Sequence, residues 1–226
     1  MTFTVGGLCR RTGQFGTALS TSSIGAGGRC PHAAPGLGLV VTQARTDPRL
    51  GPLGLDLLRG GRSAEEAVAA IVASTPHSAW RQLGVLTADG EAAVFTGESC
   101  ARPADGLVLG DGFVIGNWVR SEAVLAGIAA GFETDPMAEL ADRLIQGLEG
   151  GEAEGGELDP LQSAALVVCD PGYTFPIIDL RIDNSPTPIA DLRRTWERWR
   201  EIMDGYLLRA VDPAAAPDTR SLEGHA

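Results

Sequence analysis

The chain begins with MTFTVGGLCRRTGQFGTALSTS (residues 1–22), a stretch that predicts a β-hairpin. Residues 2–9 and 15–20 are rich in the apolar and β-branched side chains that strands favour. The turn RRTGQ between them contains a Thr-Gly pair, and glycine supplies the positive φ that a tight connection needs. The hairpin places a threonine, Thr2, at the start of its first strand.

Thr2 permits two interpretations. Removal of Met1 would give Thr2 a free α-amine beside its hydroxyl, and this pair forms a complete nucleophile and base. An α-amine has a pKa of about 7.7 to 8, so a useful fraction is neutral near pH 7 and no histidine is required. The alternative is that Thr2 is a β-branched residue that starts an edge strand.

The composition excludes several classes of function. The 226-residue chain has a formal net charge of -11, from 18 basic and 29 acidic side chains, which disfavours nucleic acid and anionic lipid as partners. No apolar run reaches the length of a bilayer span, and the N-terminal segment has neither a basic region before an apolar stretch nor a small-residue cleavage site, so we expect a cytoplasmic protein. The four cysteines and three histidines are scattered, which predicts neither a metal site nor a cofactor.

The order of the remaining elements is typical of an α+β protein. The expected elements after the hairpin are a strand at 37–44, helices at 51–61 and 63–75, strands within 80–118, helices at 121–133 and 136–149, strands at 163–169 and 174–182, and a helix at 188–208. The strands within 80–118 follow one another through short turns, so we expect one antiparallel meander. Residues 23–36 and the acidic stretch 149–160 show no period and are expected to be loops.

The predicted fold is a four-layer αββα sandwich of two stacked antiparallel sheets, because helices on both outer faces would bury the apolar runs. We expect one domain at residues 1–210, which ends in an amphipathic helix, and a mobile tail at 211–226. The apolar stripe of that helix could pack on its own sheet or form a homodimer with a second copy.

Six stretches of the chain carry a family resemblance: MTFTVGGLCRRTGQFGTALSTS, GLGLVVTQARTDPRLGPLGLDLLRGGRSAEEAVAAI, RQLGVLTADGEAAVFTGESC, GNWV, QSAALVV and IDLRID. Together they resemble the DUF1028 family, a group of uncharacterised proteins placed in the N-terminal-nucleophile (Ntn) hydrolase superfamily. The resemblance covers about residues 2–195 and implies the αββα sandwich. As a superfamily expectation it also implies hydrolysis of a small or peptide-like amide substrate, with Thr2 as the nucleophile.

Three positions are candidate catalytic residues on this resemblance. Beside Thr2, Asn117 follows a glycine and suits an oxyanion site, although asparagine after glycine is also common in turns. Ser163 belongs to a Gln-Ser pair that corresponds to a recurrent feature of the family pattern, and Gln162 of the same pair is a candidate substrate contact.

Further candidate substrate contacts lie at strand ends. Ser20 and Thr21 would face Thr2 across the hairpin, or they are ordinary strand-end hydroxyls. Thr42 and Gln43 end a buried strand and either line a pocket or bond the adjacent turn. Asp47 either works with the nearby arginine as an acid and a base or forms a local ion pair in a turn.

Two functions therefore remain open. The first is an N-terminal-nucleophile amide hydrolase, in which Thr2 attacks and Asn117 or backbone N–H groups hold the oxyanion. The second is a non-catalytic binding or scaffold protein that has the same fold but lacks the chemistry.

Overall fold

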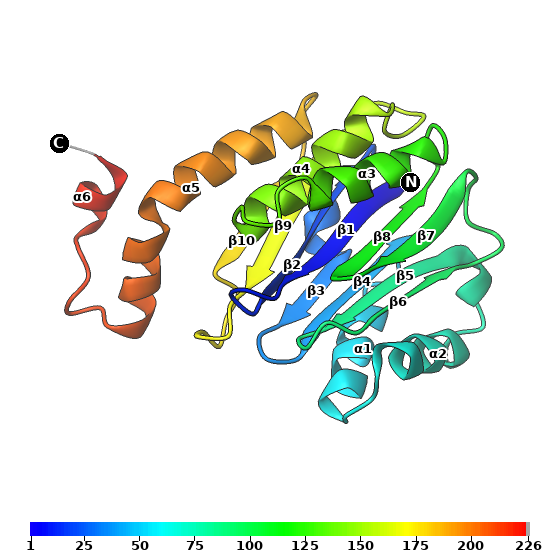
Figure 1. Ribbon diagram of the computed structural model, residues 1–226, viewed down its shortest axis with the longest axis horizontal. Coiled ribbons are helices and arrows are strands. Elements are labelled where there is room, and N and C mark those ends of the chain that lie inside the picture. The colour runs from blue at the N-terminus through cyan, green and yellow to red at the C-terminus, as the bar shows by residue number, and fades with distance from the viewer. Residues whose placement is uncertain (225–226) are drawn as a thin grey trace.

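A computed structural model describes residues 1–224, and within them the chain forms six α-helices and two antiparallel β-sheets (Figure 1). The six strands of the larger sheet are, in spatial order, β10 (Ile178–Ile182), β9 (Ser163–Cys169), β2 (Gln14–Thr21), β1 (Thr2–Cys9), β8 (Gly112–Asn117) and β7 (Ala104–Leu109). The smaller sheet has the order β3 (Pro31–Ala34), β4 (Gly38–Ala44), β5 (Arg81–Thr87) and β6 (Ala92–Thr96). The predicted hairpin is confirmed as β1 paired with β2.

Helices cover the outer face of each sheet (Figure 1). Those on the six-stranded sheet are α3 (Ala123–Glu133), α4 (Leu140–Ala153) and α5 (Pro188–Val211), and those on the four-stranded sheet are α1 (Leu50–Arg59) and α2 (Ala64–Ser74). A third apolar core lies between the sheets and includes Val41, Phe113 and Ile115. The predicted α+β class with two antiparallel sheets is confirmed, and the arrangement is compatible with a sandwich.

Side-chain alternation along β1 decides which residues lie between the sheets. Phe3 and Val5 belong to the core beneath α3 and α4. Thr2 and Thr4 therefore point the other way, toward the four-stranded sheet. The hydroxyl of Thr4 confirms this direction, because it donates to Oε1 of Gln43 on β4 at 2.6 Å.

The two sheets approach closely around the ring of Phe113. A Cβ atom on Gly6 of β1 would lie 2.4 Å from this ring, and one on Gly84 of β5 would lie 2.2 Å from it. Only a residue without a side chain fits at either position, so the glycines set the spacing between the sheets.

The predicted single meander within 80–118 is wrong. Strands β5 and β6 join the four-stranded sheet, whereas β7 and β8 join the six-stranded sheet, and the chain crosses between the sheets at residues 97–103. The reason is long-range pairing, because β8 aligns with β1 from Thr2 opposite Asn117 to Gly7 opposite Gly112. The stretch expected to be a loop at 23–36 also contains the short strand β3, which pairs with β4.

Helix α4 begins four residues later than predicted. The backbone N–H of Met137 donates to the carboxylate of Asp135 at 3.0 Å, and that of Ala138 donates to the Asp135 carbonyl at 3.1 Å. These bonds form a turn around Pro136, so the proline lies in the connection and the helix starts at Leu140.

The C-terminal segment contains one helix beyond the amphipathic helix that the sequence predicts. Ile189, Leu192 and Trp196 of α5 pack into the core of their own chain. The segment expected as a mobile tail at 211–226 contains α6 (Thr219–Glu223), whose preceding residue Asp218 accepts a hydrogen bond from the backbone of Ser221 at 3.1 Å. Residues 225–226 lie outside the described part of the chain.

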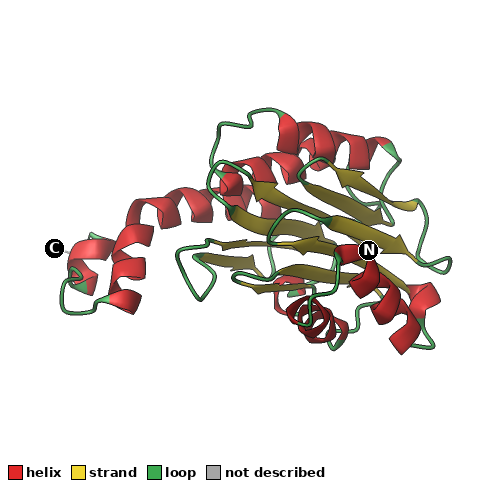
Figure 2. Cartoon of the chain, turned by 60° about the horizontal axis from the view of Figure 1, so that its bottom comes forward, coloured by secondary structure: helices red, strands yellow, loops and turns green. Residues whose placement is uncertain are grey.

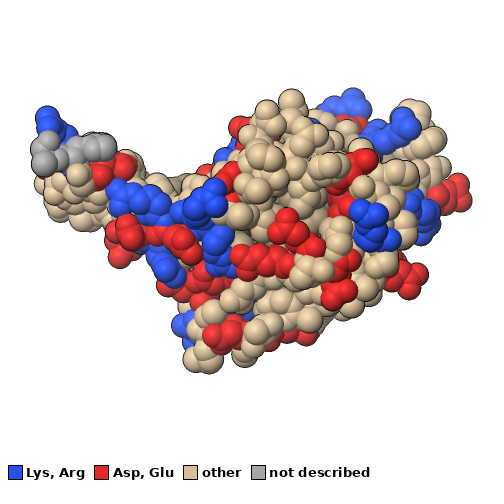
Figure 3. All heavy atoms as spheres, turned by 90° about the horizontal axis from the view of Figure 1, so that it is seen from above, with Lys and Arg blue, Asp and Glu red and all other residues tan. Residues whose placement is uncertain are grey.

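The end of α5 and all of α6 project from the body of the molecule (Figure 2). Tyr206 of α5 donates to the carboxylate of Glu223 at 2.5 Å, and the side chain of Leu222 lies against Gly205, so the two helices hold one another. Acidic and basic side chains are interspersed along this projection (Figure 3). Within residues 1–224, no helix is both long and apolar enough to cross a membrane.

Candidate functional site between the sheets

Four predicted site residues form a row across the end of the six-stranded sheet. The strand order β9-β2-β1-β8 places Ser163, Thr21, Thr2 and Asn117 next to one another. Strand register aligns Thr2 with Asn117 and Thr21 with Ser163. All four are at most 4% exposed, so the row lies under the surface at the end of the inter-sheet space.

The carbonyl of Met1 is the point where two of these hydroxyls meet. The Thr21 hydroxyl donates to the Met1 carbonyl oxygen at 2.5 Å, and the Thr2 hydroxyl donates to the same oxygen. On the other side, the sulfur of Met1 lies 3.8 Å from the hydroxyl of Ser22. The peptide group that joins Met1 to Thr2 is therefore fixed between polar side chains.

Three buried amide side chains form the floor beneath Thr2. Nε2 of Gln43 donates to the Thr2 carbonyl at 3.1 Å and to Oε1 of Gln82 at 2.8 Å. Nδ2 of Asn117 donates to the same Gln82 oxygen at 3.0 Å and lies 3.4 Å from the Thr2 carbonyl. The network links both sheets and fixes the backbone of Thr2, so Gln43 and Asn117 act first on Thr2 itself.

Gln82 is a site residue that the sequence analysis missed. It is fully buried on β5, and its Nε2 donates to the Gly116 carbonyl at 2.9 Å. The available signal was the same as for Gln43, namely an amide in an apolar strand, since a buried amide needs partners.

The remaining residues near the row hold the loop after β2. The Ser163 hydroxyl donates to the carbonyl of Ser23 at 2.6 Å, and Nε2 of Gln162 donates to the carbonyl of Ser22 at 2.6 Å. Ser20 lies on the opposite face of its strand from Thr21, and its hydroxyl donates to the Ser163 carbonyl at 3.1 Å. The side chains of Ser163 and Gln162 thus position the loop that borders Met1, whereas Ser20 bonds strand β9.

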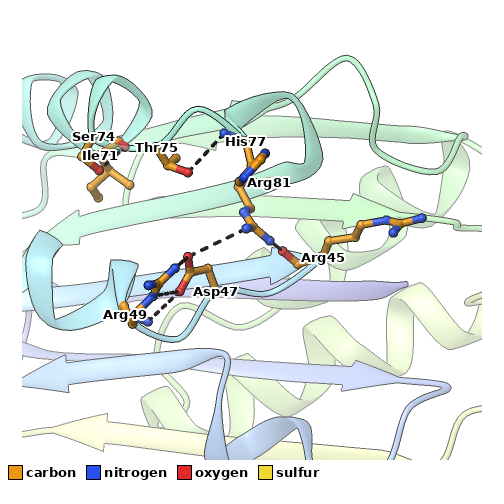
Figure 4. A network of polar contacts seen from close by, with 8 residues as sticks. All are labelled: Arg45, Asp47, Arg49, Ile71, Ser74, Thr75, His77 and Arg81. Atoms are coloured by element: carbon orange, nitrogen blue, oxygen red, sulfur yellow. Dashed lines mark hydrogen bonds and ion pairs between the residues drawn. The ribbon is translucent and has the colours of Figure 1, made fainter.

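Thr42 and Asp47 lie apart from the row. Thr42 is adjacent to Gln43 on β4 and therefore faces the helix side of its sheet, where its hydroxyl has no hydrogen-bond partner within residues 1–224. Both oxygens of Asp47 accept from the guanidinium of Arg49, at 2.9 and 2.8 Å, and Arg81 lies 3.8 Å away (Figure 4). These hydrogen bonds from Arg49 lower the pKa of Asp47 to about 2, as a local ion pair would.

A cavity of about 390 Å³ opens beside Met1 and Asn117. Its walls include Ala44, Trp80, Cys100 and Trp118. Two wall residues have a left-handed backbone, with φ of 70° at Ala44 and 59° at Trp118, which is strained for residues with side chains. The indole N–H of Trp118 donates to Asp159 at 2.9 Å and helps to hold this conformation. Each strained residue directly follows an amide of the floor, either Gln43 or Asn117.

Glu157 is the second residue that the sequence analysis missed. It is 3% exposed, and one carboxylate oxygen accepts from the backbone N–H of Ser22 at 3.0 Å. The other oxygen has no hydrogen-bond partner within residues 1–224. Burial raises the pKa of Glu157 above its ordinary value, and burial lowers the pKa of the Met1 amine while the charge of Glu157 opposes that change.

The thiols near Met1 are poor nucleophiles. Burial raises the pKa of both Cys30 and Cys100, so the reactive thiolate form is scarce near neutral pH. Within residues 1–224, no three His, Cys, Asp or Glu side chains come together as metal ligands. Thr2 is therefore the candidate nucleophile of the site. Its hydroxyl already lies beside a carbonyl group, and its nitrogen would become an amine if Met1 were removed.

The fold and the site define an α+β protein with a polar site between two sheets, built around a threonine at the start of a central strand. The sequence model of the DUF1028 family, a family of unknown function, matches residues 2–192 of this chain. The chain therefore belongs to this family.

A solved structure is similar to most of this chain. The crystal structure of protein SPO2555 from Silicibacter pomeroyi, itself assigned to DUF1028, has 28% sequence identity with this chain and a TM-score of 0.82. The match covers 88% of this chain and 85% of that one. Comparison with curated proteins finds no match.

Proposed function

We propose that this chain is an N-terminal-nucleophile hydrolase, with the fold of that superfamily, that cleaves a small or peptide-like amide. The observation that carries the proposal is the position of Thr2, whose buried hydroxyl lies against a carbonyl at the end of the inter-sheet space. The proposal requires that Met1 be removed, because the Thr2 nitrogen must be an amine to act as a base.

The reaction needs only groups that Thr2 then carries. Its hydroxyl oxygen attacks the substrate carbonyl carbon, and the hydroxyl proton passes to the α-amine, directly or through one water. The tetrahedral intermediate collapses, the C–N bond breaks, and the leaving amine takes that proton. Water then hydrolyses the ester on Thr2 and returns the hydroxyl proton, so that one amide and one water give an acid and an amine.

Burial of the site favours the base. The Met1 amine already has a pKa lowered from about 8.0, with burial as the main cause, although Met1 is 37% exposed. Thr2 is 4% exposed, and desolvation at this position would likewise lower the pKa of a free Thr2 amine, which favours the neutral form that acts as a base.

Thr21 is the best-placed donor for the oxyanion. Its hydroxyl donates at 2.5 Å to the carbonyl that is bonded to the Thr2 nitrogen, close to where a substrate carbonyl must lie. The amide of Asn117, predicted for this role from the sequence, already donates to Gln82 at 3.0 Å. In the proposed mechanism Asn117 therefore positions Thr2, while Thr21 stabilises the developing negative charge.

The first test is the mass of the intact protein isolated from its native cell. We expect a mass lower by one methionine residue, and retention of Met1 would overturn the hydrolase proposal in favour of a binding or scaffold protein. The second test uses Met1-free protein and a panel of aryl amides of small acids and amino acids. Thr2→Ala should abolish turnover without lowering the melting temperature, and Thr2→Ser should retain turnover because serine carries the same two groups.

A further inference from the structure

Met1 occupies a binding position formed by Thr21, Thr2, Ser22 and the cavity wall, which we call the seat. Its carbonyl accepts hydrogen bonds from Thr21 and Thr2, its sulfur lies 3.8 Å from the Ser22 hydroxyl, and it forms part of the wall of the 390 Å³ cavity. If Met1 is removed, the polar groups that hold its backbone and the space that holds its side chain become free. What fits this seat is an aminoacyl group.

The position of that group matches a reaction intermediate. In the structure an aminoacyl group is bonded to the Thr2 nitrogen, and in the proposed acyl-enzyme an acyl group is bonded to the Thr2 hydroxyl oxygen. These two atoms are carried by neighbouring carbons, and the Thr2 hydroxyl already hydrogen-bonds the Met1 carbonyl. The residue in the seat is therefore a close guide to the acyl part of the substrate.

The buried carboxylate of Glu157 is a reason to expect a positive charge on the acyl part of the substrate. Glu157 is 3% exposed, and one of its carboxylate oxygens lacks any hydrogen-bond partner within residues 1–224. Its other oxygen accepts from the N–H of Ser22, the residue whose hydroxyl contacts the Met1 side chain. A buried carboxylate with an unused oxygen is costly unless a cation or donor compensates it.

The charges of the Met1 ammonium and of Glu157 each affect the pKa of the other group. Arg29 is the basic side chain that also acts on this amine, and its charge opposes that of Glu157. Loss of Met1 moves the free α-amine of the chain to Thr2 and leaves the position that the Met1 ammonium occupied without a cation.

We infer that the substrate carries a free α-ammonium group next to the scissile amide, as in an amino-acid amide or the first residue of a short peptide. In this complex Glu157 binds the ammonium, Thr21 binds the carbonyl, and an apolar side chain of the size of methionine enters the cavity beside Trp80 and Trp118. The inference rests on the proposed function, because it requires Thr2 to be the free N-terminus.

The test compares two substrates that differ only at the amine. Met1-free protein is assayed with L-methionine p-nitroanilide and with its N-acetyl derivative, and we expect kcat/KM to be at least about tenfold higher for the free amine. Glu157→Gln should lower kcat/KM for the free amine by about 10- to 100-fold and leave the N-acetyl derivative unchanged. Glu152→Gln is the matched control, because it removes the same charge from an exposed position nearby.

A binding measurement separates the two proposals. Met1-free Thr2→Ala protein cannot turn over substrate, and titration calorimetry should show that it binds L-methioninamide more tightly than N-acetyl-L-methioninamide. The inference is overturned if the two ligands bind equally, if N-acetyl substrates are cleaved as well as free amines, or if Glu157→Gln slows both substrates equally. Selective binding without turnover by the unmutated protein would instead overturn the hydrolase proposal alone.

Discussion

Replacement of Gln82 by methionine should lower the free energy of unfolding by about 2 to 6 kcal/mol. Methionine has a similar length and volume, but it neither accepts the hydrogen bonds from Gln43 and Asn117 nor donates to the carbonyl of Gly116. Gln43 keeps its bond to the Thr2 carbonyl at 3.1 Å but loses the second, and Asn117 is left with a long contact of 3.4 Å. Two buried N–H donors thus lose a partner, and each costs about 1 to 3 kcal/mol.

The assay for this change is equilibrium unfolding in urea, followed by tryptophan fluorescence at pH 7. Gln14→Met is the control, because Gln14 makes one bond to Asp170 at 2.8 Å and both residues are partly exposed, so water replaces the lost partner. We expect the control to cost less than about 1 kcal/mol. If Gln82→Met is within about 0.5 kcal/mol of the control, the amide network does not stabilise the fold as argued.

Three other changes test separate parts of the structure. Gly84→Ala would place a Cβ atom 2.2 Å from the Phe113 ring and should cost about 1 to 3 kcal/mol in thermal unfolding, whereas Gly110→Ala meets no atom within 4 Å and should cost little. Asp47→Asn should lower the free energy of unfolding at pH 5, and this loss should shrink as the pH falls from about 4 toward 2. The reason is that the folded pKa of Asp47 is lowered to about 2, so its stabilising charge is lost as it protonates. An equal loss at pH 5 and at pH 2 in urea unfolding would contradict this. Ser63→Ala removes the N-cap of α2, whose side chain accepts from the helix backbone, and should cost about 1 kcal/mol in urea unfolding, while an unchanged midpoint would show that the cap is not needed.

Local patterns in the sequence predicted most elements of the fold. The alternation and Thr-Gly turn of the first hairpin correspond to β1 and β2. The helix expected at 63–75 corresponds to α2, which the structure starts with a complete capping box of Ser63 and Glu66. These signals are readable because each depends on bonds between residues that are close in the chain.

The structure places some predicted site residues on the inner face of their sheet and others on the outer face. Within each pair at a strand end, Ser20 with Thr21 and Thr42 with Gln43, only the second residue points between the sheets. Alternation predicts that such neighbours point to opposite faces, but the inner face is decided by what packs on the strand. Here Phe3 packs under the helices and so directs Thr2 toward the other sheet.

Glu157 shows the limit of sequence reasoning most clearly. It lies in the acidic stretch 149–160 with several other carboxylates, and no feature of the amino-acid sequence distinguishes it from its exposed neighbour Glu154. Its burial arises because the chain after α4 returns to the β2 loop, where the backbone N–H of Ser22 binds it. That contact spans 135 residues of sequence.

The sequence by itself determined helices α1 to α5, the first hairpin and the α+β class, because short-range periodicity, capping and turn chemistry encode them. Only the tertiary structure decided how β5 to β8 divide between two sheets, which hydroxyls meet at Met1, and which carboxylate is buried beside it. Those features depend on pairing and packing between segments that are far apart in the chain, and their energies are set by neighbours that no local pattern identifies.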